Sequence, residues 1–188
     1  RTIGGREWLR KFFTEPHNDL KKIMGTQTVI RTLMEHVHDW PTDISNGTVL
    51  VMDKFMDYAL DPIPENVNSI NGLIYKWLHS EDYSMVSYSV PHFADFFRGL
   101  RNVTSLMDGL NLPPNIQIYI DRINQLLREA PLKELSQTRA REKFSIQQHL
   151  YFGFHLRGRY RSSTLELIDI FSRLDAWYSM AVAVKTYK

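Results

Sequence analysis

The stretch Ser163–Ala181 reads STLELIDIFSRLDAWYSMA, and the spacing of its large apolar residues decides the fold. Residues at alternating steps of four and three form an apolar series, Leu167, Phe171, Leu174, Tyr178 and Ala181. Steps of this size align side chains along one side of an α-helix, where a second helix can pack lengthwise. The stretch therefore predicts a long C-terminal helix whose apolar seam contacts other helices.

The rest of the chain also favours helices, because apolar residues recur at helical intervals between proline-containing breaks. Pro91 is expected to interrupt or kink one of these helices, since proline removes a backbone donor. We expect helices at Gly5–Glu15, from a cap at Asn18 to about Val37, at Thr48–Leu60, at Glu65–His79, at Tyr83–Leu110 and from Pro113 to a point before Pro131. The predicted fold class is all-α, a multi-helix bundle with a long C-terminal lever-type helix.

The length of the chain allows one core or two closely packed ones. We expect a single helical unit over residues 1–188, with room for two subdomains, residues 1–40 plus 160–188 and residues 41–159. Arg1 leads almost directly into a helical pattern, and no glycine or proline stop signal follows Ala183. We therefore expect the chain to be a fragment of a larger protein.

The composition excludes several classes of protein. Apolar residues make up 43% and charged residues 23%, which is typical of a globular chain and not of a disordered one. The absence of cysteine excludes disulfides, thiolate nucleophiles and cysteine-based zinc sites. The net charge of +2 does not by itself indicate a nucleic-acid or membrane partner. No apolar stretch approaches the roughly 20 residues that cross a bilayer, so we expect a soluble, cytoplasmic protein.

Metal and phosphate chemistry have no clear motif in this chain. Neither a P-loop nor an H-E-x-x-H sequence is present, and His36 and His38 lie two residues apart, on opposite sides of a helix. The doublet His38-Asp39 is the one feature that suggests a metal-dependent phosphohydrolase. Its further ligands would have to come from other histidines, among them His17, His79 and His92.

Two carboxylates at helical spacing are the remaining candidates for acid–base chemistry. Asp53 and Asp57 lie four residues apart and could share one helix face. Lys54 lies between them and the neighbouring positions are apolar, as on the exposed side of an amphipathic helix. We predict that the chain has no catalytic residue, no metal site and no cofactor of its own.

Positive charge is concentrated between residues 139 and 161. This segment contains six basic residues, one acidic residue (Glu142) and several aromatic residues. The basic residues are Arg139, Arg141, Lys143, Arg157, Arg159 and Arg161. Arginine pairs well with phosphate, and basic residues interleaved with aromatics suit contact with nucleic acid. The alternative is a helix-turn whose arginines cover an aromatic core, with Gly153 and Gly158 as breaks.

The segment Thr2–Phe13, near the start of the chain, reads TIGGREWLRKFF. It resembles the pattern "T-x-x-G-x-x-L-L-x-x-W-L" of the helical core of the MutS mismatch-repair family, with Gly5 at its glycine. Pro16, Asp19 and Gln27 then resemble positions of the continuation "P-x-x-D-x-x-x-I-x-x-R-Q-x-x-V-x-x-L".

The second part of the resemblance lies in the predicted C-terminal helix. Its matching residues are Leu174, Asp175, Ser179 and Ala181, in the family pattern "L-D-x-x-x-S-x-A". The family places this pattern on a lever helix that leads toward an ATPase domain. The resemblance thus implies a larger parent protein that binds DNA, uses ATP and Mg, and forms a homodimer.

The chain departs from the family in three respects. Thr26 stands where the family has an arginine before Gln27, residues 40–160 match no quoted pattern, and the segment Arg139–Arg161 is too short for the family's DNA-clamp domain. We therefore expect a divergent, non-catalytic core domain that couples a separate ATPase domain to DNA or to a partner. The rival hypothesis is a helical protein–protein interaction module unrelated to repair.

Overall fold

The computed structural model describes residues 2–16 and 18–187, and every regular element within these residues is an α-helix. The helices are α1 (Ile3–Thr14), α2 (Leu20–Glu35), α3 (Asn46–Asp57), α4 (Ser69–Leu78), α5 (Ser80–Met107), α6 (Pro114–Leu126), α7 (Ala130–Ser136), α8 (Ile146–Arg157) and α9 (Arg161–Thr186). The predicted all-α fold is confirmed, as is the long C-terminal helix.

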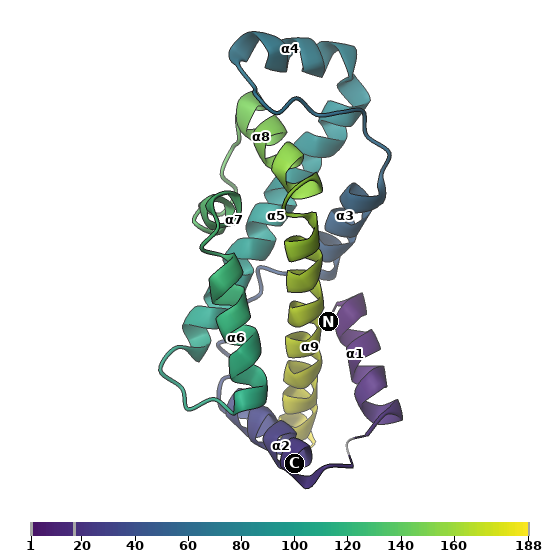
Figure 1. Cartoon of the computed structure of the whole chain (residues 1–188). Coiled ribbons are helices and arrows are strands. Elements are labelled where there is room, and N and C mark those ends of the chain that lie inside the picture. The colour runs from purple at the N-terminus through teal and green to yellow at the C-terminus, as the bar shows by residue number, and fades with distance from the viewer. Residues whose placement is uncertain (1, 17, 188) are drawn as a thin grey trace.

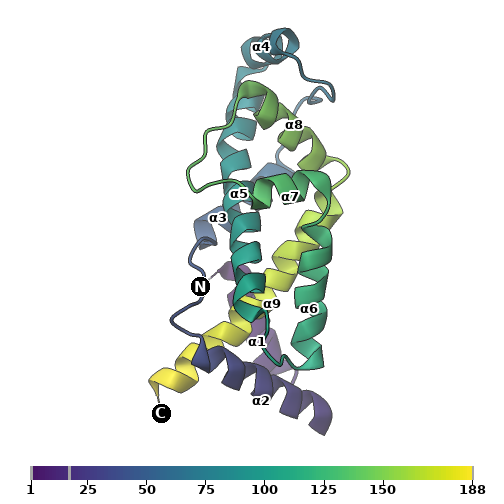
Figure 2. The ribbon, with the colours of Figure 1, turned by 90° about the vertical axis from the view of Figure 1, so that its left-hand side faces the viewer.

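The bundle is elongated, and its two longest helices organise the others (Figure 1). Helix α9 runs through the lower half in Figure 1 and packs against α1, α2, α6 and α8. Helix α5 packs against α3, α4, α6, α7 and α8. The two views in Figures 1 and 2 place α4 at one end of the molecule, and α2 and the C-terminus at the other.

One main apolar core links these two groups of helices. Four phenylalanines, Phe55, Phe93, Phe96 and Phe97, are completely buried, and Phe96 meets Phe171 of α9 edge to face at 5.9 Å between ring centroids. The same cluster of buried side chains continues to α2 and to the end of α9. Both of the subdomains suggested by the sequence thus contribute to one continuous core.

The predicted seam of α9 is buried over its full length. All five seam residues have at most 7% of their surface exposed. The buried surface of α9 is wider than one seam, however, because Ile170, Ala176 and Trp177 are also buried. A two-helix seam was therefore too narrow a prediction: α9 is surrounded by several helices, and more than one of its sides is covered.

The N-cap of helix α2 lies one residue later than predicted. Asp19, and not Asn18, is the N-cap of this helix, and its Oδ1 accepts a hydrogen bond from the Lys21 N–H at 2.9 Å. Both residue types favour this position, so the sequence did not discriminate between them.

Two other helices also differ from prediction at their ends or interior. Helix α4 begins at Ser69 instead of Glu65, because Asn68 caps it by accepting from the N–H groups of Ile70 and Asn71. Helix α5 continues past Pro91 without a break. A proline leaves one carbonyl of the preceding turn without its partner, and the packing of α5 against five other helices compensates for this loss.

Helix α8 was not predicted, and the alternative interpretation of this segment took Gly153 as a break. Gly153 is instead buried inside the helix, where a Cβ would lie 2.7 Å from Cγ1 of Val86 on α5. The glycine allows α8 and α5 to approach closely, which a larger side chain would prevent. Gly158 does end the helix, as expected.

Truncating the seam should destabilise the whole bundle. We expect Leu167→Ala to lower the free energy of unfolding by about 2–5 kcal/mol, because it leaves a cavity beside a fully buried side chain. Leu165→Ala, on the same helix but 37% exposed, is the control and should cost clearly less. Urea unfolding followed by circular dichroism measures both, and equal losses would contradict the assignment of the seam.

Candidate functional site

The two ends of the chain are joined by a buried carboxylate. Oδ2 of Asp175, on α9, accepts hydrogen bonds from the backbone N–H of Thr2 at 2.9 Å and from its hydroxyl Oγ1 at 2.7 Å. Asp175 is 3% exposed, and Thr2 is also 3% exposed. A buried carboxylate is costly unless its oxygens are hydrogen-bonded, so this pairing fixes the position of Thr2. We call the pair of Thr2 and Asp175 the clasp.

The clasp also starts helix α1. Oγ1 of Thr2 accepts from the N–H of Gly5 at 3.0 Å and is thus the N-cap of the helix. A Cβ on Gly5 would lie 2.2 Å from Oδ2 of Asp175, and a Cβ on Gly4 would lie 2.3 Å from Oγ of Ser172. Only glycine allows the first turn of α1 to lie this close to α9.

Beyond the clasp, α1 runs beside α9 through a layer of aromatic and charged side chains. Trp8 donates from Nε1 to Oδ1 of Asp169 at 2.8 Å, and the guanidinium of Arg173 lies 3.9 Å from the centre of its ring. Phe12 stacks on Trp177 with ring centroids 5.7 Å apart. Cation–π and stacking contacts of this kind stabilise the pairing of two helices.

The other residues of the MutS-like patterns have diverse surroundings. Leu174 and Ala181, both in α9, are completely buried. The Ser179 hydroxyl donates a hydrogen bond to the backbone carbonyl of Asp175 at 2.7 Å. Pro16 and Gln27 are exposed. The structure therefore brings Asp175, of the residues that matched in α9, together with Thr2 and Gly5, while Pro16 and Gln27 lie on the surface.

Arg157, one of the six basic candidates, is engaged in the fold. Its Nη1 donates to the carbonyls of Phe55 at 2.6 Å and Tyr58 at 2.7 Å, at the C-terminal end of α3. Cationic side chains satisfy the last carbonyls of helices in this way. Burial and the neighbouring charge of Arg161 lower the pKa of Arg157. Its guanidinium thus holds α3 against α8.

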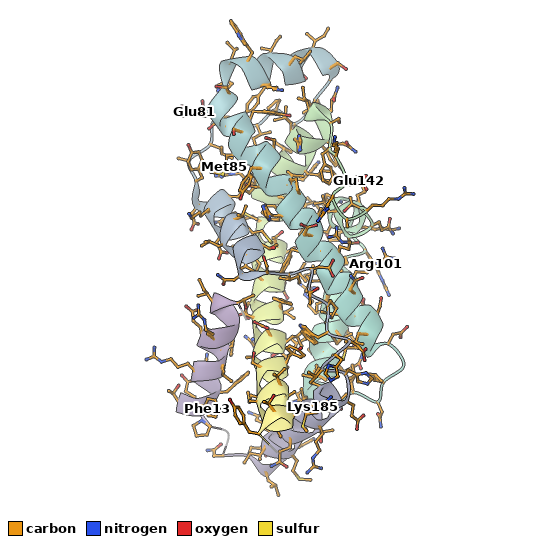
Figure 3. The ribbon with its side chains drawn as sticks, turned by 180° about the vertical axis from the view of Figure 1, so that it is seen from behind. Phe13, Glu81, Met85, Arg101, Glu142 and Lys185 are labelled. Atoms are coloured by element: carbon orange, nitrogen blue, oxygen red, sulfur yellow. The ribbon has the colours of Figure 1, made fainter. Side chains whose placement is uncertain are left out.

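The remaining five basic residues form two separate groups. Arg159 and Arg161 are exposed near the turn from α8 to α9, where Arg161 lies 3.8 Å from Oδ1 of Asp57. Arg139, Arg141 and Lys143 are exposed in the connection from α7 to α8. Figure 2 shows this connection and the α8–α9 turn on opposite sides of α8. Figure 3 likewise shows Glu142, in the same connection, on the side away from α1 and α3.

A hollow of about 460 Å³ lies between α1, α3 and α9, and its rim is acidic. Glu7, Asp53 and Asp169 line it, with Lys11 as the one basic residue. Burial raises the pKa of Asp53, and the nearby charges of Asp57 and Glu7 raise it further. An anionic surface of this kind repels phosphate, so the hollow does not suit nucleic acid.

The predicted histidine candidates do not gather into a metal site in the part of the chain that is described. His38 and Asp39 are exposed, and Nδ1 of His36 lies 3.6 Å from Oδ2 of Asp39. His17 lies outside the described residues. His79, which is one of these candidates, does place a ligand atom within 4.8 Å of one from Asp61 and one from Asp82, but not of the His38-Asp39 doublet.

This second group is satisfied by its own hydrogen bonds. Nδ1 of His79 lies 2.9 Å from Oδ2 of Asp61, and the Asp61 N–H donates to Oδ2 of Asp82 at 3.1 Å. These contacts hold the connection between α3 and α4 against the first turn of α5. Burial and the two carboxylates raise the pKa of the neighbouring Tyr75 to about 12, so its hydroxyl stays protonated.

Comparisons with models of known families, with curated proteins and with solved structures gave no match. Among the residues described, no helix has both the length and the apolar character needed to cross a membrane. The site must therefore be interpreted from its own geometry. That geometry singles out two features, the clasp with its aromatic layer and the exposed arginines of the α8–α9 turn.

Sequence reasoning missed Arg173, which is central to the α1–α9 contact. Besides covering Trp8, it donates from Nη1 to the Tyr119 hydroxyl at 2.6 Å and bridges to Asp169 at 3.0 Å. Its spacing from Asp169 (i, i+4) is typical of an ion pair on a helix surface. That signal occurs in many helices, so it did not identify the contact with α1.

Removing the hydroxyl of the clasp should destabilise the contact between α1 and α9. We expect Thr2→Val to lower the free energy of unfolding by about 2 kcal/mol, because Asp175 loses one donor and α1 loses its cap. Thr2→Ser keeps the hydroxyl and is the matched control. Urea denaturation distinguishes them, and a valine variant as stable as the serine variant would show that the clasp contributes little.

Proposed function

We propose that this chain is the helical core of a MutS-like DNA-binding ATPase and acts in it as a mechanical element, not as a catalyst. The clasp is the observation that carries the proposal. The two segments that resemble the family lie more than 170 residues apart (Thr2 and Asp175 are separated by 173 positions), yet they bind each other directly. An accidental resemblance at each end would not require the matching residues to meet.

The shape of α9 supports a mechanical role. Its 26 residues correspond to a rod of about 39 Å, at ~1.5 Å per residue. The rod is buried through most of its length and contacts α1, α2, α6 and α8. Close-packed interiors respond to displacement as units and do not deform gradually. Movement applied at the C-terminal end of α9 would thus be transmitted to the α8–α9 turn.

Arg159 and Arg161 are the best candidates for contact with DNA phosphates in this proposal. Both are exposed at the start of the rod, whereas Arg157 is bound to α3. ATP and Mg would bind in the ATPase domain of the parent protein, and the chain itself would supply only the coupling and the phosphate contacts.

Reversing the charge of these two arginines should weaken DNA binding without regard to sequence. In the intact protein, we expect Arg159→Glu with Arg161→Glu to reduce affinity for duplex DNA about tenfold or more and to lower the slope of log affinity against log salt by about 2. The control is Lys21→Glu with Lys22→Glu on α2, which changes the net charge equally at exposed positions. Fluorescence anisotropy over a salt series measures both pairs. Equal binding by the arginine variant and the unmodified protein would reject the contact.

The mechanical role predicts that the clasp governs coupling and not binding. We expect ATP to change the affinity of the intact protein for DNA, and Thr2→Val to reduce the size of that change while Thr2→Ser preserves it. DNA titrations with and without ATP give both affinities for each variant. An intact protein whose DNA affinity is the same with and without ATP would contradict the proposal.

A helical protein–protein interaction module is the second candidate, and one surface favours it. Helix α4 has an exposed apolar face at the end of the bundle. The two candidates differ in a simple measurement, since an interaction module unrelated to repair would not bind duplex DNA even at low salt.

A further inference from the structure

Helix α4 has its apolar face turned toward solvent. Five large side chains on it are at least half exposed: Ile70 (71%), Leu73 (57%), Ile74 (50%), Trp77 (81%) and Leu78 (61%). They follow the spacing i, i+3, i+4, i+7 and i+8, which on an amphipathic helix marks the face that packs against a neighbour. In this structure the opposite face makes that contact, through Gly72 and Tyr75. We call the five exposed residues the α4 face.

Five of the large apolar side chains that are exposed in the described residues lie on this one helix. Others, Phe13 with Leu20, Ile23 and Met24, lie where α1 leads into α2, toward the opposite end of the bundle. Contiguous apolar surface of this kind on a folded chain marks an interaction site. The position of α4 at the end of the molecule leaves room for a second body beside it (Figure 1).

We propose that the α4 face binds the α4 face of a second copy of this chain, in a symmetric antiparallel pair. A two-fold axis between Leu73 and Ile74 would make the contact self-complementary, as a symmetric dimer requires. Trp77 of one copy would then lie over Ile70 of the other. Leu78 would lie opposite Ser69, whose small side chain leaves space for it.

The area of the face fits this occupant. The exposed parts of the five side chains amount to roughly 600–700 Å² in each copy, or on the order of 1,300 Å² for the pair. Stable specific interfaces bury about 1,200–2,000 Å² in total. The face therefore reaches the lower part of that range if the partner covers all of its exposed surface.

Pairing would not bury an unpaired charge. Lys76 is the one charged residue of α4, and its Nζ lies 5.2 Å from the centre of the Tyr83 ring on α5, away from the exposed face. The helix is also formed in advance, because Asn68 and Asn71 cap it reciprocally. A preformed, uncharged surface loses little order and little hydration of polar groups on association.

Sedimentation velocity of the chain over a range of concentrations tests the proposal. We expect a reversible dimer, and we expect Trp77→Glu to raise its dissociation constant by about 30-fold or more, as for a central aromatic anchor. Phe13→Glu is the matched control, since Phe13 is 72% exposed but lies on α1. Unchanged helicity by circular dichroism would show that each variant is folded, as the exposure of both side chains predicts.

The absence of cysteine allows a second measurement that also reports the geometry. Leu73→Cys places a thiol beside the proposed axis, so mild oxidation should link two copies, while Phe13→Cys should not give a linked dimer. A chain that is monomeric at all concentrations and not linked through residue 73 would overturn the proposal, and would leave the α4 face to a different protein. A dimer that is lost with Phe13→Glu but kept with Trp77→Glu would overturn it as well.

Discussion

A buried carboxylate that joins the two ends of the chain is the constraint on which the arrangement of this chain depends. The donors at Asp175 are the N–H and hydroxyl of Thr2, at the opposite end of the sequence. A buried carboxyl group is costly unless it is hydrogen-bonded, so the contact with α1 stabilises α9 in its place. The same hydroxyl caps α1, which means that one small group both begins a helix and closes the bundle. Large side chains at positions 4 and 5 would separate these partners.

Helix α9, which carries Asp175 of the clasp, contacts four other helices, α1, α2, α6 and α8. The N-terminal end of α9 contacts α8 beside the exposed Arg159 and Arg161, and its middle contacts α1. Its C-terminal part contacts α2, and the Tyr178 hydroxyl donates to the carbonyl of Val37, just beyond α2, at 2.9 Å. A helix held at several points along its length moves as one body. Such a body would suit the proposed transmission of movement between distant sites.

The sequence predicted what depends on local periodicity and missed what depends on distant contacts. The seam of α9 could be predicted from spacing alone, because apolar residues at helical intervals form a face that packs against other helices, whichever helices these are. Gly153 was misinterpreted, because its role is to allow close approach to Val86, 67 positions away in sequence, and no local pattern shows this. The role of Arg157 depends on the carbonyls of α3. For the same reason six basic residues that are close in sequence separate into distinct groups in the fold.

Helix α4 also shows that local periodicity does not predict which side of a helix the fold buries. Its pattern of apolar residues is that of a helix packed in a core, and a periodicity argument would assign its apolar face to the interior. The fold instead buries the side that carries Gly72, since α8 approaches most closely there: a Cβ at Gly72 would lie 3.3 Å from Cγ2 of Ile146. The larger apolar side is thereby left without a partner within the described residues. Trp77 and the four aliphatic side chains do not stabilise the isolated chain while they are exposed, and they lower its solubility. A contact between molecules would bury them, and this is the explanation that we favour.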